Sequence, residues 1–481
     1  MTRDDLLVAL RHSPIVASVQ ASEDSPLDDP GVLLKLAEAS AKEGVRVLRL
    51  QGVATISLIR SSLRLPVIGL IKRSYPDSDV YITPTMREVE ELLGTGCEII
   101  AVDGTSRIRP GGVLLADLIH AIHEAGRLAM ADCDTAEGAQ SAIQAGADLV
   151  GTTLAGYTAA RLKTAGPDLE LLRELVAAVE VPVFAEGRYE EPWQVQAALH
   201  IGAAGVVIGG ALNDPVKQTR RFLGPVVPHG EPVGAFDIGG TLIRFGLFTP
   251  EWVLSHSERE PLPSSRDARM SWMSQHVKRH GLKRIGISTG GTVDPWTRTL
   301  IEAKPLIPDH VGTDFSGLAN EVFALNDGLA TAWGHSCLPQ FAGLRVATLA
   351  LGTGVGCGLV ERGRIVMGPQ GEYPRLNDLA VGDHSFEELL GGASLTDNPS
   401  DEDRQRAIEA FGRAWDVIRS MWMPDHVVLC GGVGLAPWLH ASMLEGTGAR
   451  LTLSPFGADA GLFGAAALAL FPPEGLSTFF T

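Results

Sequence analysis

Val183-Phe-Ala-Glu-Gly-Arg188 is the stretch that decides the fold class of the first half of this chain. It is a short apolar run that ends in a carboxylate, a glycine and an arginine. The same pattern recurs along residues 1–225, and helical patterns such as Met86–Thr95 and Leu169–Val179 separate the runs. The runs are Ile15–Gln20, Val45–Gly52, Val67–Lys72, Ile99–Gly104, Leu128–Cys133, Leu149–Leu154, Val183–Arg188 and Gly205–Gly210.

Most of these runs are continuously apolar, which is typical of parallel strands that are covered on both faces. Eight strand–helix units within about 225 residues match the number and length of the units in a TIM barrel. The first half is therefore predicted to be an α/β domain built as a (β/α)8 barrel.

The composition indicates a folded protein whose partners are small molecules. Of its 481 residues 45% are hydrophobic and 20% are charged, which suits large buried cores, and the length suggests about three domains. The formal net charge of −17, without a dense Lys/Arg tract, argues against binding to nucleic acid or to anionic membranes. No apolar run is long enough to span a bilayer, and Ala458–Phe471 is interpreted as a buried helix.

The cysteines point to a reducing compartment. They are scattered and form no Cys-x-x-Cys pair, so a disulfide framework is not expected and a cytoplasmic location fits. The charged N-terminus, Met1–His12, carries no signal-peptide pattern. We also expect a homo-oligomer. The cysteines are Cys97, Cys133, Cys337, Cys357 and Cys430.

Polar side chains stand where the predicted strands end. In a TIM barrel these ends meet at one face, which carries the chemistry. Gly187 follows one strand, and Gly209 and Gly210 end the last run, so their backbone N–H groups are expected to bind a phosphate. The polar residues are Gln20, Arg49, Lys72, Asp103, Asp132, Thr152, Glu186 and Arg188.

Each of these residues also has a simpler interpretation. A lysine at a strand end, such as Lys72, is usually a solvated surface group. Asp103 could form a turn with Gly104, and Asp132 could cap the next helix. Glu186 favours a functional site, because an unpaired carboxylate in an apolar strand is costly.

Several stretches of this half resemble bacterial N-acetylmannosamine-6-phosphate 2-epimerases. They are Asp24-Ser-Pro-Leu-Asp28, Ile71-Lys-Arg73, Ala101-Val-Asp-Gly-Thr105, Ala131-Asp-Cys133, Gly151-Thr-Thr-Leu-Ala-Gly-Tyr-Thr158 and Ala185-Glu-Gly-Arg-Tyr189. The resemblance covers all the repeated units and implies reversible inversion at C2, which yields N-acetylglucosamine 6-phosphate. It also implies that Lys72 and Glu186 carry the proton transfers.

That chemistry suits a lysine and a glutamate. The C2 proton lies next to the aldehyde of the open-chain sugar, so its removal gives an enolate that is reprotonated on the other face. One acid and one base are needed, with pKa values near the working pH. The sequence leaves open which residue is which; Arg49 and Asp132 are expected to position the sugar, together with Gln20 and Arg188. A different phosphosugar isomerase or synthase remains an alternative.

The second half begins after a Pro- and Gly-rich stretch, Gly224–Pro232, which is interpreted as a linker over residues 225–232. It separates predicted domains of residues 1–224 and 233–481. Three glycine loops follow strand-like runs: Asp237-Ile-Gly-Gly-Thr241, Leu351-Gly-Thr-Gly-Val-Gly-Cys-Gly358 and Leu429-Cys-Gly-Gly-Val-Gly-Leu435. One such loop is often only a hairpin, but three in order favour phosphate binding, with Mg²⁺ near Asp237.

With Gly286-Ile-Ser-Thr-Gly-Gly291 and Leu325-Asn-Asp-Gly328, these loops resemble sugar kinases of the ROK family, which have the actin-like ATPase fold. The position beside an epimerase points to N-acetylmannosamine kinase. The resemblance implies that Asp327 is the base for the 6-hydroxyl and that Asn326, Glu372 and Glu387 contact the sugar. It implies that ATP phosphates and Mg²⁺ bind at Asp237, Gly239, Gly240, Thr241, Gly352, Thr353 and Gly354, and that Gly431 and Gly432 border adenosine.

One departure from that family concerns zinc. Many members have a histidine and a cysteine cluster after the Gly-Glu segment, whereas here Arg375 takes the place of the histidine and no cysteine lies between Cys357 and Cys430. We therefore expect ATP and Mg²⁺ but no zinc. An alternative for this half is a sugar-binding sensor or scaffold, since relatives include repressors, although those carry an N-terminal DNA-binding domain.

Overall fold

The computed structural model describes residues 1–481 except 22–24, 165, 224–229, 304–306, 308, 393–394, 396–398, 440–449, 474–475 and 477–481. The chain forms two compact units, Met1–Arg220 and Arg221–Thr481, which meet within helix α10 (Pro215–Leu223). Strand β9 begins at Val233, where the sequence predicts the second domain to start. Residues 225–229 of the predicted linker, and Asp24 of the first epimerase-like stretch, lie outside the described residues.

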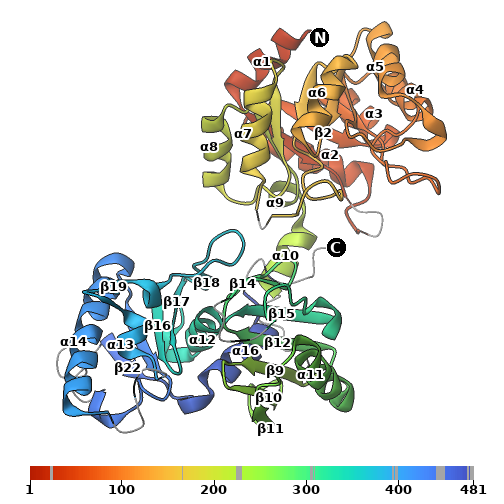
Figure 1. Ribbon diagram of the computed structural model, residues 1–481. Coiled ribbons are helices and arrows are strands. Elements are labelled where there is room, and N and C mark those ends of the chain that lie inside the picture. Colours follow the sequence, from red (N-terminus) through yellow and green to blue (C-terminus); the bar gives the residue numbers. More distant parts are fainter. Residues whose placement is uncertain are drawn as a thin grey trace. The chain divides into compact units, whose positions relative to one another are not determined.

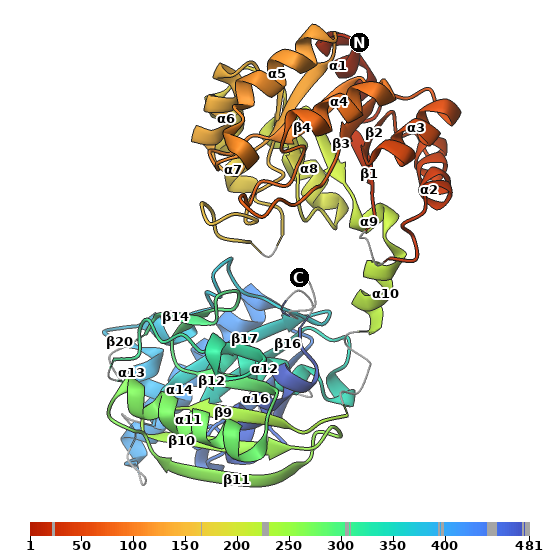
Figure 2. The same cartoon turned by 90° about the vertical axis from the view of Figure 1, so that its right-hand side faces the viewer.

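The first unit is a closed barrel of eight parallel strands, so the TIM-barrel prediction is confirmed (Figures 1 and 2). Consecutive strands are neighbours, and β1 also pairs with β8, which closes the ring. The strands are β1 (Ile15–Val19), β2 (Val47–Gln51), β3 (Val67–Leu70), β4 (Ile99–Asp103), β5 (Leu128–Asp132), β6 (Leu149–Gly151), β7 (Val183–Glu186) and β8 (Gly205–Ile208).

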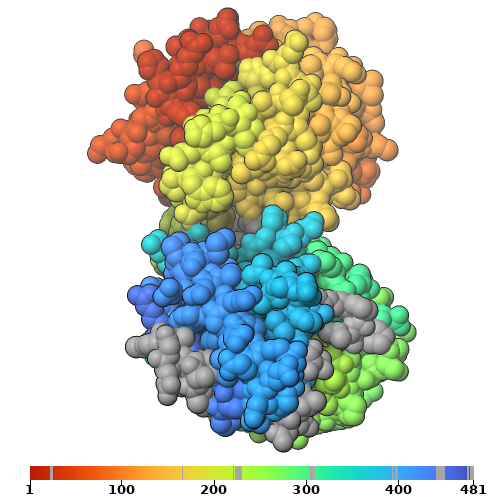
Figure 3. Space-filling view, turned by 60° about the vertical axis from the view of Figure 1, so that its left-hand side comes forward, coloured from red at the N-terminus to blue at the C-terminus, as the bar shows by residue number. Residues whose placement is uncertain are grey.

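Helices cover the outside of this barrel, and segments from its start, middle and end all appear on its surface (Figure 3). They bury apolar side chains against the strands in one continuous core. The helices are α2 (Pro30–Lys42), α3 (Val53–Ser62), α4 (Met86–Thr95), α5 (Leu115–Glu124), α6 (Ala136–Gln144), α7 (Leu169–Ala178), α8 (Pro192–Ile201) and α9 (Gly210–Asn213).

A further helix, α1 (Arg3–His12), forms from the charged N-terminal segment. Thr2 and Asp5 form a capping box at its start. Its buried residues Leu6 and Leu10 pack with apolar residues of the barrel interior, such as Phe184. The helix therefore fills the interior from one end, a role that its polar composition did not predict.

The second unit contains two five-stranded sheets with the same strand order. In β11-β10-β9-β12-β15 and in β18-β17-β16-β21-β22, an antiparallel meander is extended by two parallel strands. This duplication is the actin-like architecture that the sequence predicts. The strands are β9 (Val233–Ile238), β10 (Leu242–Phe248), β11 (Leu254–Pro261), β12 (Arg284–Thr289), β15 (Glu321–Asn326), β16 (Val346–Leu351), β17 (Val355–Glu361), β18 (Arg364–Ile365), β21 (His426–Cys430) and β22 (Leu451–Leu453).

Small strand pairs, β13 (Thr292–Asp294) with β14 (Thr299–Glu302) and β19 (Ala380–Val381) with β20 (His384–Ser385), add to these sheets. Helix α11 (Arg266–His280) packs beside the first sheet, and α13 (Phe386–Leu390) and α14 (Asp401–Val417) pack beside the second (Figures 1 and 2). None of the helices in the described ranges is long and apolar enough to cross a membrane.

Helices α12 (Asp327–Ser336) and α16 (Ala460–Leu470) pack tightly against each other. A Cβ atom on Gly334 would lie 2.9 Å from the Cα atom of Gly464, so the two backbones nearly touch. Helix α16 is the buried apolar helix that the sequence predicts. The start of α12, where Asp327 lies, packs equally closely on β17, because a Cβ atom on Gly328 would overlap with the backbone oxygen of Cys357.

Candidate active sites

The mouth of the barrel brings four of the predicted residues together. Asp132 and Glu186 are the last residues of β5 and β7, and Lys72 lies two residues beyond the end of β3. Arg49 lies on β2 and is buried inside the barrel. Because all strands run parallel, these residues share one end of the barrel.

Arg49 links two carboxylates at this mouth. Its Nη2 atom lies 2.6 Å from Oδ2 of Asp132, and its Nε atom lies 3.2 Å from Oε1 of Glu186. The hydroxyl of Thr153 lies 2.7 Å from Oδ1 of Asp132 and 2.9 Å from Oε2 of Glu186. A hydroxyl has only one proton to donate, so Thr153 bonds one carboxylate at a time.

This environment moves two pKa values toward neutrality. Burial, with the charge of Asp132, raises the pKa of Glu186 to about 7 against the opposing effects of Arg49, Thr153 and Lys72. The barrel walls around Lys72 exclude part of the water from its ammonium group, and this desolvation, with the charge of Arg49, lowers the pKa of Lys72. The side chain still has access to solvent at the open mouth of the barrel. Lys72 and Glu186 interact electrostatically, so both groups face one space, where the carboxyl of Glu186 can change protonation near neutral pH.

Other predicted residues have local structural roles. Asp103 accepts hydrogen bonds from the backbone and hydroxyl of Thr105, as the turn interpretation expects. Arg188 donates to the carbonyls of Gly166 and Ala155, at 2.8 Å each, and so anchors the segment after β6. Gln20 donates to Ser18, and Thr152 links β6 to the backbone of Glu186. The cap of α6 is Thr135, which leaves Asp132 to its contacts with Arg49 and Thr153.

The glycines expected to bind phosphate follow β7 and β8. Gly187 has a φ of 107°, a conformation that strongly favours glycine. Gly209 and Gly210 connect β8 to the short helix α9. Phosphate binding at these positions stays a prediction.

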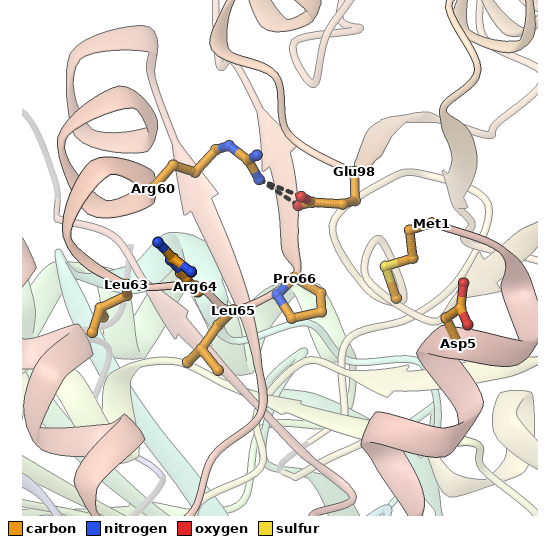
Figure 4. Close-up of a pocket in the computed structure, with 8 residues that line it drawn as sticks. All are labelled: Met1, Asp5, Arg60, Leu63, Arg64, Leu65, Pro66 and Glu98. Atoms are coloured by element: carbon orange, nitrogen blue, oxygen red, sulfur yellow. Dashed lines mark hydrogen bonds and ion pairs between the residues drawn. The ribbon is translucent and has the colours of Figure 1, made fainter.

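A pocket of about 390 Å³ lies at the end of the barrel opposite to Lys72 and Glu186 (Figure 4). Pro66 and Glu98, which line it, directly precede β3 and β4. Glu98 is paired with Arg60 at 2.5 Å and accepts a bond from the backbone of Val67. The ion pair of Arg60 and Glu98 thus connects α3 to the starts of β3 and β4, which fits the stabilising role of this end of a TIM barrel.

The second unit contains a cavity of about 1020 Å³ between its two sheets. This volume is at the upper end of the range for small-molecule sites and is sufficient for two ligands. The cavity is lined by the predicted residues Asp237, Gly239, Gly240, Thr241, Asn326, Asp327, Gly352, Thr353, Gly354, Glu387, Gly431 and Gly432.

Asp327 is the first residue of α12, and its carboxyl faces this cavity. Burial and the charge of Asp237 raise the pKa of Asp327 to about 6, although the backbone N–H of Gly328 donates to it. The buried side chain of Asn326 caps the helix through Gly328 and also donates to the carbonyl of Gly291 at 2.9 Å. Asn326 therefore holds Asp327 in place, in addition to any sugar contact.

Asp237, on β9, has an environment suited to a cation or to phosphate groups. Burial raises its pKa, while Arg244 at 3.8 Å and a hydrogen bond from Ser288 at 3.1 Å act in the opposite direction. Beside it, a Cβ atom on Gly352 or Gly432 would meet nothing within 4 Å, so these loops border open space. Carboxylates and glycine loops facing one hollow fit a nucleotide with its magnesium ion.

Residues 33–227 of the chain match the NanE family model, described as "Putative N-acetylmannosamine-6-phosphate epimerase". A "Bifunctional enzyme NanE/NanK" from Brucella suis biovar 1 (strain 1330) is 31% identical over 507 aligned positions, covering 95% of this chain and 94% of the relative. The chain belongs to the bifunctional NanE/NanK family. Met1–Arg220 is therefore its NanE unit, and Arg221–Thr481 is its NanK unit.

The NanE unit is also 46% identical over 208 residues to a protein of Clostridium perfringens (strain SM101 / Type A) named "Putative N-acetylmannosamine-6-phosphate 2-epimerase". That alignment covers 43% of this chain and 94% of the relative. A solved ROK-family glucokinase from Streptomyces griseus, in complex with glucose and AMPPNP, matches 50% of this chain and 99% of its own at 19% identity and a TM-score of 0.43.

In the NanK unit, Glu372 is placed away from the cavity. Its side chain is exposed and accepts a bond from the backbone N–H of Gln370 at 2.8 Å. Tyr373 and Arg375 line the cavity instead. Arg375 forms an ion pair with Glu302 from β14.

Glu387 lines the cavity beside Gly354. A Cβ atom on Gly354 would lie 2.5 Å from Oε1 of Glu387, so a larger residue there would require the end of the Glu387 side chain to move. Three further residues contact the predicted site residues: Thr153 in the NanE unit, and Ser288 and Arg244 in the NanK unit. Thr153 lies near the end of the predicted run Leu149–Leu154, where polar residues mark the site, but a single serine or arginine within a strand gives no such signal.

Proposed function

We propose that the NanK unit phosphorylates N-acetylmannosamine at O6 with ATP and that the NanE unit converts the product to N-acetylglucosamine 6-phosphate by inversion at C2. The observation that carries the proposal is the pairing of Lys72 with Glu186 at one barrel mouth, where burial raises the pKa of the carboxyl to about 7. The two reactions are consecutive, which gives a reason for their fusion in one chain.

In the barrel, one of Lys72 and Glu186 removes the C2 proton and the other returns a proton to the opposite face. The aldehyde at C1 takes up the electron pair as an enolate, and a positively charged lysine or arginine favours that charge. Arg49 forms an ion pair with Glu186 and donates a hydrogen bond from Nη2 to Asp132. No change of oxidation state and no nucleotide are involved in this step.

In the NanK cavity, Asp327 accepts the proton of the sugar 6-hydroxyl while that oxygen attacks the terminal phosphorus of ATP and ADP leaves. Asn326 fixes the position of Asp327, and Glu387, which lines the cavity, would bind sugar hydroxyls. The loops at Gly239–Thr241 and Gly352–Gly354 would hold the phosphates, and Gly431 and Gly432 would border the adenosine. Asp237 would hold Mg²⁺, which neutralises phosphate charge when bound.

One NMR experiment in deuterated water tests both reactions. N-acetylmannosamine and MgATP are added to the chain, and the 6-phosphate, its C2 epimer and deuterium at C2 are followed. Lys72→Ala should stop C2 exchange but not phosphorylation, and Asp327→Ala should stop phosphorylation but not exchange on supplied 6-phosphate. Sugar binding without phosphorylation by the unchanged chain would replace the kinase with a sugar sensor. Epimerisation without uptake of solvent deuterium at C2 would disprove the proton-transfer mechanism.

A further inference from the structure

Four candidate metal ligands lie between the first sheet of the NanK unit and helix α11. His256 and Glu258 lie on β11, and His276 and His280 lie on α11, which packs beside β10 (Figure 2). Residues two apart on a strand, or four apart on a helix, point to the same side. Phe245 of β10, opposite Glu258 in register, packs on the rings of both helix histidines, so the two elements face each other here.

The donor atoms lie close together. One ligand atom each from His256, Glu258 and His280 lie within 4.8 Å of one another. Nε2 of His256 is 2.9 Å from Oε1 of Glu258, and Nε2 of His276 is 3.3 Å from Oε2 of the same carboxylate. Ligands around a tetrahedral zinc ion lie roughly 3.4 Å apart, because each bond is about 2.1 Å long. Movements of about an ångström at half-exposed side chains would complete that geometry.

One of these nitrogens has no partner in the protein. Nδ1 of His276 lies 2.9 Å from the carbonyl of Trp272, and Nε2 of the same ring already contacts Glu258. Nε2 of His280, in contrast, is shielded from solvent and has no hydrogen-bond partner among the described residues. A cation between these groups would give this nitrogen a partner and would bind the carboxylate of Glu258.

One neighbouring side chain competes with a cation for Glu258. The Nη1 atom of Arg279 lies 2.9 Å from Oε1 of Glu258, but the side chain of Arg279 is more than half exposed.

We propose that His256, Glu258 and His280 bind a divalent transition-metal ion of the zinc class, with His276 beside them as a further donor. Two imidazoles and one carboxylate favour zinc over magnesium or calcium, which prefer oxygen ligands alone. The site is separate from the cavity, because Arg244 of β10 lines the cavity whereas the adjacent Phe245 packs toward α11. The ion would tie the largely exposed edge strand β11 to α11. It is also distinct from the cysteine-based zinc site that this chain lacks.

Zinc titration of the tag-free, chelator-treated full-length chain tests this site, with ZnCl₂ alone as the probe. We expect saturable binding of one ion that His256→Gln and His280→Gln each weaken at least about 10-fold. Arg279→Gln should strengthen binding, because it removes the competing cation. His384→Gln is the matched control, since His384 faces Glu388 at 4.0 Å in another His–Glu pair of the same unit, and it should change nothing.

Thermal unfolding supplies a second measurement that does not depend on activity. Zinc should raise the Tm of the wild type and of His384→Gln, but not that of the His256→Gln, His280→Gln double variant. Circular dichroism checks that the variants remain folded. The proposal is overturned if the wild type binds no zinc saturably, or if the double variant retains the wild-type affinity and zinc-dependent Tm.

Discussion

The pH dependence of C2 proton exchange should report the carboxyl of Glu186. The pKa of this group is raised from 4.5 to about 7, which corresponds to a penalty of about 3 kcal/mol on its ionised form. The rate with N-acetylmannosamine 6-phosphate as substrate should therefore change steeply near pH 7. An ordinary glutamate would place that change near its usual pKa instead.

The direction of this change assigns the role that the sequence leaves open. If ionised Glu186 is the base, kcat/KM falls about 10-fold for each pH unit below 7, because only the ionised fraction is active. If protonated Glu186 is the acid, the same fall occurs above pH 7. Thr153→Val should then move the change to higher pH by up to about one unit, because it removes a hydrogen bond that lowers the pKa of Glu186.

Deuterium incorporation at C2, measured by NMR between pH 5 and 9 on supplied 6-phosphate, avoids the kinase reaction. Glu190→Gln is the matched control, because Glu190 is exposed, lies four residues further along and pairs with Lys217 at 2.7 Å. Its profile should equal that of the wild type. The reasoning is refuted if the wild-type rate is flat between pH 6 and 8, or if Thr153→Val leaves the midpoint unchanged.

Three further substitutions test the buried ion pairs of the barrel, the proposed base of the kinase and the contact between α12 and α16. Arg49→Met should destabilise the NanE unit by about 3–5 kcal/mol, measured by chemical unfolding, because it leaves two buried carboxylates without their cation; unchanged stability would contradict the ion-pair description. Asp327→Asn should reduce phosphorylation at least about 100-fold while C2 exchange on supplied 6-phosphate keeps its rate, and a kinase that retains its activity would exclude Asp327 as the base. Gly334→Val should destabilise the NanK unit by about 1–3 kcal/mol in thermal unfolding, because its Cβ would meet the backbone of Gly464 at 2.9 Å; Gly412→Ala, where a Cβ meets nothing within 4 Å, is the control.

The sequence predicted the barrel well because its strands are covered on both faces. Such strands appear as continuous apolar runs, and the polar residue after each run marks the strand end, as for Asp132 and Glu186. Helix α1 was missed because only Leu6 and Leu10 face the core, which is too few apolar positions for a clear helical pattern. The actin-like unit was predicted from the resemblance of its glycine loops to those of ROK-family sugar kinases, and the loops could be recognised because each follows a strand-like run.

What the sequence did not predict depends on contacts between distant segments. Arg375 and Glu302 pair although 73 positions separate them, and the departure of Glu372 from the cavity follows from a local turn around Gln370. Similarly, His256 lies on β11 and His280 lies on α11. The spacing of residues within the strand, or within the helix, does not indicate that these two side chains come close together. These arrangements arise from the packing of whole elements, which local sequence patterns do not record.

The two proposed catalytic carboxylates are tuned by the same physical means. Burial raises the pKa values of Glu186 and Asp327 toward neutral pH, and a second carboxylate raises each further: Asp132 in one unit and Asp237 in the other. The two sites differ in the groups that lower these pKa values. The full charge of Arg49 lowers the pKa of Glu186, whereas backbone and amide groups at the start of α12 lower that of Asp327. Since a fixed cation beside Glu186 favours its ionised form, burial and the charge of Asp132 must together outweigh Arg49 to hold the pKa of Glu186 near 7.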